Sequence, residues 1–458
     1  MLSNPCTWQQ NTLPRHSKCH TISTRAFALS AQNSSSILSS SSSSSGSCTQ
    51  VDDSPVSATF QPPLVDVSNL LAGQAPTQQQ TAAVRRECLS TGFLALEGHG
   101  LRQAVLLQLF AAAERFFDLP LDDKMQLVVQ DMQRGRGYEI SPEHKAYMQE
   151  YKQQQQQQQQ LAELCASSRE PSALAGILSE RFMCGPPLTQ QQLQDPYYAS
   201  ELGQVFFTPD VFPSSTAGEL QPAMQACYTQ CEAIANAVLR LFAASLGLQQ
   251  HFFDDKVCHH HSNLQVANYP SQLLLPGPAE LRKKAHSDSG TLTLLASQDY
   301  LPGSGWQAGD GGLQLLSAAG QWLEVDVPPG ALLLNLGSLM SRWTNGLWKS
   351  TLHRVTNPKP ARAHSSRRLS MAFFHKPNYD AVVQVLPTCY QTQQQQQQQQ
   401  SPGHTPVAPA LPSGPLFPPA VVGDLTRQGV LHKLRHLPPE EASRRYHALM
   451  AAARGTAT

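Results

Sequence analysis

The chain has 458 residues, enough for one large catalytic domain with appendages or for two domains. Its 33 Lys and Arg residues equal its 33 Asp and Glu residues, so the net charge favours neither a nucleic acid nor an acidic membrane surface as a partner. No stretch approaches the ~20 continuous apolar residues of a membrane-spanning helix.

The first 56 residues differ in composition from the rest of the chain. Residues 1–51 contain no Asp or Glu, carry Arg15, Lys18 and Arg25, and include a long serine run. A serine-rich, mildly basic segment without acidic residues is typical of a transit peptide, and this one lacks the continuous apolar block of a secretory signal. We therefore predict that residues 1–56 are a transit peptide and disordered linker that direct the protein to the chloroplast. A mitochondrial address is one alternative, and a tail that leaves the protein in the cytoplasm is another.

Residues 57–255 are predicted to form a mostly helical region. Two short runs of strand type, Leu64–Val67 and Gly92–Leu96, alternate with helical patterns in it. Apolar residues recur at helical spacing over about 102–117 and again over about 220–246, which predicts two amphipathic helices.

Two glutamine tracts, Gln153–Gln160 and Gln393–Gln400, interrupt the chain. Such polar repeats cannot bury a core, so we expect solvated insertions that tolerate changes in length. The second tract lies in a low-complexity linker over residues 389–419, where proline is frequent. A helical tail is predicted over residues 420–458, with its helix over about 440–453.

The pattern changes to β over residues 256–388. Seven short runs of strand type are separated by clusters of Gly, Pro and Asn, as expected for antiparallel strands in a sandwich or barrel. Because helices come first and strands afterwards, the order of elements predicts an α+β fold. The runs are Leu264–Ala267, Thr291–Ala296, Leu313–Leu316, Trp322–Val325, Ala331–Leu336, Ser350–Val355 and Leu369–Phe374.

His286 and Asp288 are two residues apart, so in a strand both side chains would point to the same face. His353 lies in the sixth of the strand-type runs, which a rolled sheet can bring back beside the first. Two neutral imidazoles and one carboxylate form the facial triad of non-haem iron(II) oxygenases. A His-x-Asp pair alone is usually a surface pair, and the prediction of an iron site therefore depends on the whole set of residues.

Arg368 and Ser370 follow one strand later and also share a face. Arg offers a planar fork of donors to a carboxylate, and the serine hydroxyl can add a hydrogen bond. Arg367 is the weaker candidate, because the residue two positions on is Leu369. Arg368 and Ser370 therefore predict a pocket for the far end of a dicarboxylate co-substrate beside the iron.

From about Pro63 to Pro387 the chain resembles the 2-oxoglutarate and iron(II)-dependent dioxygenases of the isopenicillin-N-synthase-like type. Besides the residues above, motifs in family order carry the resemblance. These motifs are Gly92-Phe93, Gly98-His99-Gly100, Phe116–Pro120, Asn268-Tyr269-Pro270, Gly312-Leu313-Gln314, Gly320-Gln321-Trp322, Asn335-Leu336-Gly337, Thr344-Asn345-Gly346 and Ser350–Val355.

The resemblance implies a double-stranded β-helix (jelly roll) core with a helical N-terminal region. It also implies that Fe(II) binds to His286, Asp288 and His353. The three residues would then be catalytic as well as metal-binding.

The same resemblance implies that the far carboxylate of 2-oxoglutarate, the co-substrate, binds to Arg368 and Ser370. Tyr269 would add a hydrogen bond from its phenol. Ala267 departs from the family pattern, since it stands where the family has Asn, so one polar contact with the co-substrate is expected to be lost.

We therefore expect an Fe(II)- and 2-oxoglutarate-dependent dioxygenase. It would hydroxylate, desaturate or cyclise a small organic substrate with O2, and it would release succinate and CO2. One alternative is an Fe(II) oxidase of the same fold that does not use 2-oxoglutarate and holds its substrate with Arg368. Another alternative is a non-catalytic jelly-roll protein that only binds a ligand. The predicted partners are the small-molecule substrate and O2, with no nucleic acid, no membrane and no protein implied.

The composition of the leader leads to a prediction that can be tested by imaging. A fluorescent protein fused behind residues 1–56 is expected to enter an organelle, because a basic, serine-rich segment without acidic residues is what import machineries read. Microscopy with chloroplast and mitochondrial markers identifies the compartment, and the fluorescent protein alone is the control. A diffuse cytosolic signal from the fusion would contradict the prediction.

Overall fold

The structure is a computed structural model, and it describes residues 58–128, 135–140, 178–214, 217–272, 281–304, 311–391 and 411–426. The predicted leader, both glutamine tracts and the helix expected over about 440–453 lie outside these residues. All described residues belong to one compact unit, Ser57–Thr458. None of the helices in the described ranges combines the length and the apolar composition needed to cross a membrane.

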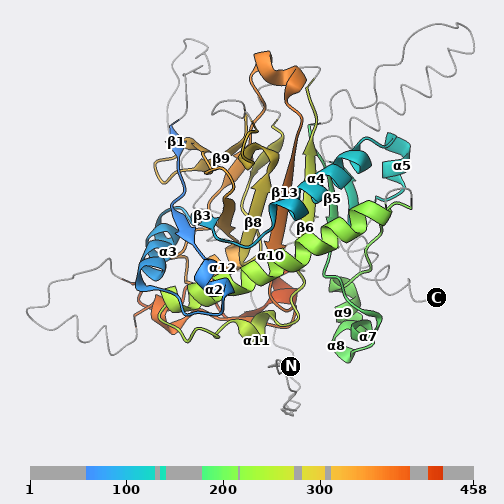
Figure 1. The fold of residues 1–458 in the computed structure, drawn as a ribbon. Helices are drawn as coiled ribbons and strands as arrows, with labels where there is room; N and C mark the ends of the chain where they lie inside the picture. The colour runs from blue at the N-terminus through green and yellow to red at the C-terminus, as the bar shows by residue number, and fades with distance from the viewer. Residues whose placement is uncertain are drawn as a thin grey trace, which may run out of the picture. The chain divides into compact units, whose positions relative to one another are not determined.

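Two large sheets form the centre of the described unit (Figure 1). In spatial order, the larger sheet consists of β2 (Leu64–Asp66), β3 (Phe93–Glu97), β11 (Leu332–Leu336), β8 (Leu292–Ser297), β13 (Arg368–His375), β6 (Asn263–Tyr269), β5 (Glu180–Cys184) and β4 (Gly137–Ile140). The smaller sheet consists of β1 (Thr59–Phe60), β10 (Trp322–Val325), β9 (Leu313–Leu316), β12 (His353–Val355) and β7 (Lys283–His286). A short pair, β14 (Val382–Val383) and β15 (Ala420–Val421), lies outside both sheets.

Neighbouring strands in these sheets are mostly distant in sequence. β8 lies between β11 and β13, and β12 lies between β9 and β7. Within the two large sheets, the pairs among strands that follow residue 256 are all antiparallel. Two facing antiparallel sheets with this interleaved order form a jelly roll. The predicted α+β fold with a jelly-roll core is therefore confirmed.

Successive side chains of a strand point to opposite faces of the sheet, so the two faces of the larger sheet contribute to two different apolar cores. The outer core lies between the larger sheet and the helices, and it contains Leu369, Met371 and Phe373 of β13. Ser370 and Ala372 of the same strand instead line a cavity between the sheets. The inner core is built from apolar side chains of both sheets, which shows that the sheets pack face to face.

Two long helices cover the outer face of the larger sheet, α4 (Gln103–Phe117) and α10 (Ala217–Ser245) (Figure 1). Both helices match their predictions, and the apolar stripe predicted for α10 is buried. Gly247, with φ of +71°, follows α10 in the left-handed conformation that often ends a helix. The other helices are α2 (Ser68–Leu71), α3 (Gln78–Ser90), α5 (Leu121–Met125), α7 (Gln190–Leu193), α8 (Pro196–Ala199), α9 (Glu201–Phe206), α11 (Asp254–Val257) and α12 (Ser338–Trp343), with 3-10 turns η1 (Gln298–Tyr300), η2 (Pro360–Ser365) and η3 (Pro387–Cys389).

Each predicted strand run after residue 256 overlaps an observed strand, whereas β7 lies outside the predicted runs. β7 is short, polar and at the edge of its sheet, so neither an apolar run nor clear alternation signals it. β12 begins at His353 rather than at the predicted Ser350. Strands β1 to β5 come from residues 57–255, so the mostly helical region also completes both sheets of the jelly roll.

A buried ion pair ties the N-terminal region to the larger sheet. The Lys124 ammonium donates to Oε2 of Glu180 at 2.8 Å and to the carbonyl oxygen of Phe117 at 2.7 Å. The Tyr138 hydroxyl donates to the same Oε2 at 2.5 Å, and the Asn268 amide donates to Oε1 at 2.8 Å. The Lys124 and Glu180 side chains are 0% and 1% exposed, so each charge depends on the other for compensation.

Removal of the carboxylate from this ion pair is expected to be strongly destabilising. Glu180→Ala leaves the Lys124 ammonium buried without a counter-charge, which typically lowers the free energy of unfolding by ~3–5 kcal/mol. Urea denaturation followed by circular dichroism measures the change. Glu139→Ala is the matched control, because it breaks a partly exposed pair with Arg181 in the same sheet and should cost no more than ~1 kcal/mol. Equal losses in the two variants would contradict the prediction.

Candidate functional site

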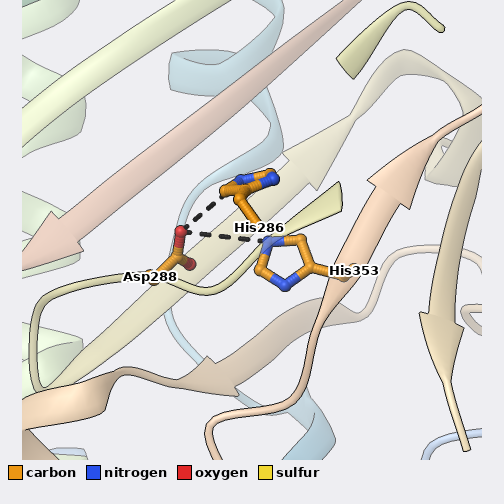
Figure 2. A group of neighbouring side chains, drawn as sticks. All are labelled: His286, Asp288 and His353. Atoms are coloured by element: carbon orange, nitrogen blue, oxygen red, sulfur yellow. Dashed lines mark ion pairs between the residues drawn. The ribbon is translucent and has the colours of Figure 1, made fainter. Parts of the chain in front are cut away.

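The register of the smaller sheet brings the predicted triad together. His286, the last residue of β7, pairs with His353, the first residue of β12. Asp288 follows two residues after β7, and its Oδ1 lies 3.8 Å from Nε2 of each histidine. Figure 2 shows the three side chains gathered around one point. One ligand atom from each lies within 4.8 Å of the other two, so a single metal ion can contact all three.

Backbone carbonyls determine which nitrogen of each histidine is available. Nδ1 of His286 lies 2.8 Å from the carbonyl oxygen of Lys284, and Nδ1 of His353 lies 3.1 Å from that of Thr351. A carbonyl oxygen only accepts, so each Nδ1 carries the proton and donates it. With the proton on Nδ1, the lone pair of a neutral ring is on Nε2, the atom that faces Asp288 in both histidines, as a metal ligand requires.

Only one of the two carboxylate oxygens of Asp288 accepts hydrogen bonds from other side chains of the described residues. Its Oδ2 accepts hydrogen bonds from the Thr293 hydroxyl at 2.5 Å and from the Asn335 amide at 2.8 Å. Burial alone would raise the pKa of Asp288, but His353 and these two hydrogen bonds lower it below its usual value. The carboxylate is therefore charged, and Oδ1 remains for a single bond to a metal.

Burial and electrostatics also keep the first histidine neutral. Burial, together with His353 and Lys283, lowers the pKa of His286 to about 4. Two neutral imidazoles and a carboxylate fit a divalent ion such as Fe(II) and leave coordination positions for other ligands. Within the described ranges, no other group of three metal-binding side chains converges in this way.

The predicted co-substrate residues line the same cavity as the triad. Arg368, Ser370 and Tyr269 border it together with His286, Asp288 and His353. The guanidinium carbon of Arg368 lies 5.0 Å from the centre of the Tyr269 ring. Ser370 pairs across the sheet with Ala267, whose small side chain stands where the resemblance implied an Asn.

Arg367 points to the opposite face of β13. Its Nη1 donates to Oδ1 of Asp118 at 2.7 Å, and its Nε donates to Oδ1 of Asn268 at 3.2 Å. Arg367 therefore lies away from the cavity, on the side of the N-terminal region.

The sequence analysis missed the two residues that hold Asp288. Thr293 and Asn335 each lie between two leucines, in Leu292–Ser297 and Leu332–Leu336. A polar side chain inside a buried strand needs a buried partner, so this isolation was the available signal. Thr293 is close to Asp288 in sequence, whereas the partner of Asn335 could not be identified, because the pairing of β11 with β8 follows from the tertiary fold.

Two family models match the chain. The 2OG-Fe(II) oxygenase superfamily matches residues 261–377, and the N-terminal region of the non-haem dioxygenase in morphine synthesis matches residues 62–186. Together they cover the strands from β2 to β13 and the triad, whereas α7 to α11 lie between the two matched ranges.

Similar proteins agree with these matches. Clavatol oxidase claD from Penicillium crustosum is 30% identical over 336 residues, which cover 72% of this chain and 89% of that protein. The 2-oxoglutarate-dependent dioxygenase citB from Monascus ruber is 31% identical over 350 residues, which cover 71% of this chain and 88% of that protein.

A solved structure shows the same fold. The full-length T7H protein from Neurospora crassa, in complex with alpha-KG and 5-formyluracil, has a TM-score of 0.58 and 21% identity to this chain. The match covers 80% of this chain and 95% of that one. With the two family models and the relatives at 30% identity or more, these findings identify the chain as a member of the 2-oxoglutarate and Fe(II)-dependent oxygenase superfamily, an oxidoreductase that uses Fe(II) and 2-oxoglutarate.

Proposed function

We propose that His286, Asp288 and His353 hold the catalytic Fe(II) of an oxygenase that acts on a small organic molecule. The observation that carries this proposal is the convergence of Oδ1 of Asp288 with the Nε2 atoms of both histidines. When bound, Fe(II) supplies the O2 chemistry that couples oxidation of the substrate to conversion of 2-oxoglutarate into succinate and CO2.

The protein contributes the orientation of the three ligands. Thr293 and Asn335 occupy Oδ2 of Asp288, so the carboxylate can bind the metal through one oxygen only. A carboxylate bound in this way leaves one more coordination position open than a carboxylate bound through both oxygens. Mutation of a residue that holds a metal ligand by a hydrogen bond typically lowers metal affinity or activity by roughly 10- to 100-fold.

We further propose that Arg368 and Ser370 hold the distal carboxylate of 2-oxoglutarate, with Tyr269 beside it. All three residues line the cavity that contains the triad, and Arg368 can grip a carboxylate through two parallel hydrogen bonds. Ala267, opposite Ser370, adds no polar group, so the binding of this carboxylate depends chiefly on Arg368 and Ser370.

The unequal exposure of the triad supports an approach of the substrate from the His286 side. The His286 side chain is 33% exposed, whereas those of His353 and Asp288 are 9% and 6% exposed. The cavity walls near the triad include the apolar side chains of Leu295 and Leu313. Such walls exclude water and suit the apolar part of an organic substrate.

His353→Ala is expected to abolish both iron binding and turnover, because it removes one of three ligand atoms. The metal content of the purified protein and the rate of succinate release measure the two effects, and circular dichroism verifies the fold. His364→Ala is the matched control, since His364 lies exposed in η2 and should be dispensable. Iron content and turnover like those of the unaltered protein in His353→Ala would refute the assignment of this ligand.

Arg368→Lys is expected to raise the Michaelis constant for 2-oxoglutarate by roughly ten- to a hundredfold, because lysine keeps the charge but loses the two-pronged fork. Iron content should not change. Arg367→Lys is the control, since Arg367 lies on the opposite face of β13 and contacts Asp118. An unaltered dependence on 2-oxoglutarate in Arg368→Lys would instead favour a role for Arg368 in binding the substrate.

A further inference from the structure

Arg368 has a charged partner inside the fold. Its Nη1 donates a hydrogen bond to Oδ2 of Asp299, which lies in the short turn η1 directly after β8. The two side chains are only 8% and 11% exposed. A hydrogen bond between two ionised groups is stronger and more directional than one between neutral groups. Asp299 therefore restricts how the guanidinium can turn.

This contact uses one corner of the guanidinium and leaves one edge unused. The hydrogen bond from Nη1 to Asp299 is the guanidinium's sole hydrogen bond within the described part of the chain, and the buried Nε has no partner. Nε and Nη2 lie on the same edge of the planar group, where two parallel N–H groups match the two oxygens of a carboxylate. The edge without a partner is thus the one that can pair with a carboxylate side-on.

A second buried arginine makes a counter-charge necessary at this point. Arg282 and Arg368 flank the Tyr269 ring, with their guanidinium carbons 5.8 Å and 5.0 Å from its centre. Burial and the nearby Arg368 lower the pKa of Arg282 to about 10. Burial alone would also lower the pKa of Arg368, but Asp299 and Tyr269 raise it. Asp299 thus offsets the repulsion between the two guanidinium groups.

The turn that carries Asp299 is itself attached to β13. The side-chain oxygen of Gln298 accepts a hydrogen bond from the backbone N–H of Leu369 at 2.8 Å. The Ser304 hydroxyl donates to the carbonyl oxygen of Asp299 at 2.8 Å, and the Ser297 hydroxyl lies 3.3 Å from its Oδ2. Hydrogen bonds to both the backbone and the side chain of Asp299 therefore fix its position beside Arg368.

We propose that Asp299 is a positioning residue for the co-substrate: it holds Arg368 through Nη1 so that the Nε–Nη2 edge meets the distal carboxylate of 2-oxoglutarate. The proposal rests on the proposed role of Arg368. Asp299 could also have the opposite effect on the affinity for 2-oxoglutarate. If Asp299 competed with the co-substrate for the guanidinium, its removal would tighten the binding of 2-oxoglutarate.

Direct binding measurements separate these two effects. Isothermal titration calorimetry without O2 gives the Kd of 2-oxoglutarate for the Fe(II)-loaded enzyme, in the unaltered protein and in Asp299→Ala and Asp299→Asn. We expect a Kd raised roughly tenfold or more in Asp299→Ala, because a charge-assisted hydrogen bond is lost. In Asp299→Asn we expect a smaller rise of roughly threefold, because the amide oxygen still accepts from Nη1 without charge. In steady-state assays the loss should appear in the Michaelis constant for 2-oxoglutarate rather than in kcat.

Asp118→Ala is the matched control, because it breaks the ion pair of the neighbouring Arg367 on the opposite face of β13 and should leave the Kd unchanged. A Kd equal to or lower than that of the unaltered protein in the Asp299 variants overturns the proposal. Should Asp299→Ala fail to fold, as judged by circular dichroism, the Kd of Asp299→Asn decides by the same criterion. The Kd of Arg368→Lys is measured in the same way. An unchanged Kd in Arg368→Lys refutes the proposed role of Arg368. A raised Kd in Arg368→Lys, together with an unchanged Kd in both Asp299 variants, refutes the role of Asp299 alone.

Discussion

Side chains along β13 alternate between two environments, and a shift of one residue in its pairing would exchange them. Leu369, Met371 and Phe373 pack under the helices, while Arg368 and Ser370 line the cavity that contains the triad. Antiparallel pairing with β6 on one edge and β8 on the other holds this register. The burial of the apolar face thus keeps the charged face of the strand in the site.

Asp288 and Arg368, two buried charges that line the cavity, are arranged in the same way. Asp288 uses one oxygen for hydrogen bonds within the protein and leaves the other for a metal. Arg368 uses one corner for Asp299 and leaves an edge for a carboxylate. A buried charge is costly without a partner, and each group obtains part of its compensation from the fold. In the proposed function, Fe(II) and 2-oxoglutarate provide the rest.

The N-terminal region supports the site from outside the cavity. The buried pair of Lys124 and Glu180 receives a hydrogen bond from Asn268, the residue before Tyr269 on β6. Arg367, the residue before Arg368, donates to the same Asn268 and to Asp118 at the end of α4. Adjacent residues on a strand point to opposite faces, so contacts with the N-terminal region orient the neighbouring residues toward the cavity.

The sequence by itself determined the α+β class, the two long amphipathic helices and the strand runs after residue 256, because hydrophobic periodicity reports local structure directly. It also singled out His286, Asp288, His353, Arg368 and Ser370, since their spacing and chemical types together predict an iron site with a carboxylate pocket beside it. It did not predict β7, because a short polar edge strand carries neither an apolar run nor a clear alternation.

Only the tertiary structure decided which residues hold these groups in place. Asn335 on β11 and Asp299 on η1 contact Asp288 and Arg368, which are distant from them in sequence, whereas Thr293 on β8 contacts Asp288 from close by in sequence. Such contacts follow from the order and register of strands in the two sheets, which no local pattern in the sequence specifies. Local periodicity therefore predicts the strands and the candidate ligands, and the pairing of the strands decides which polar groups meet.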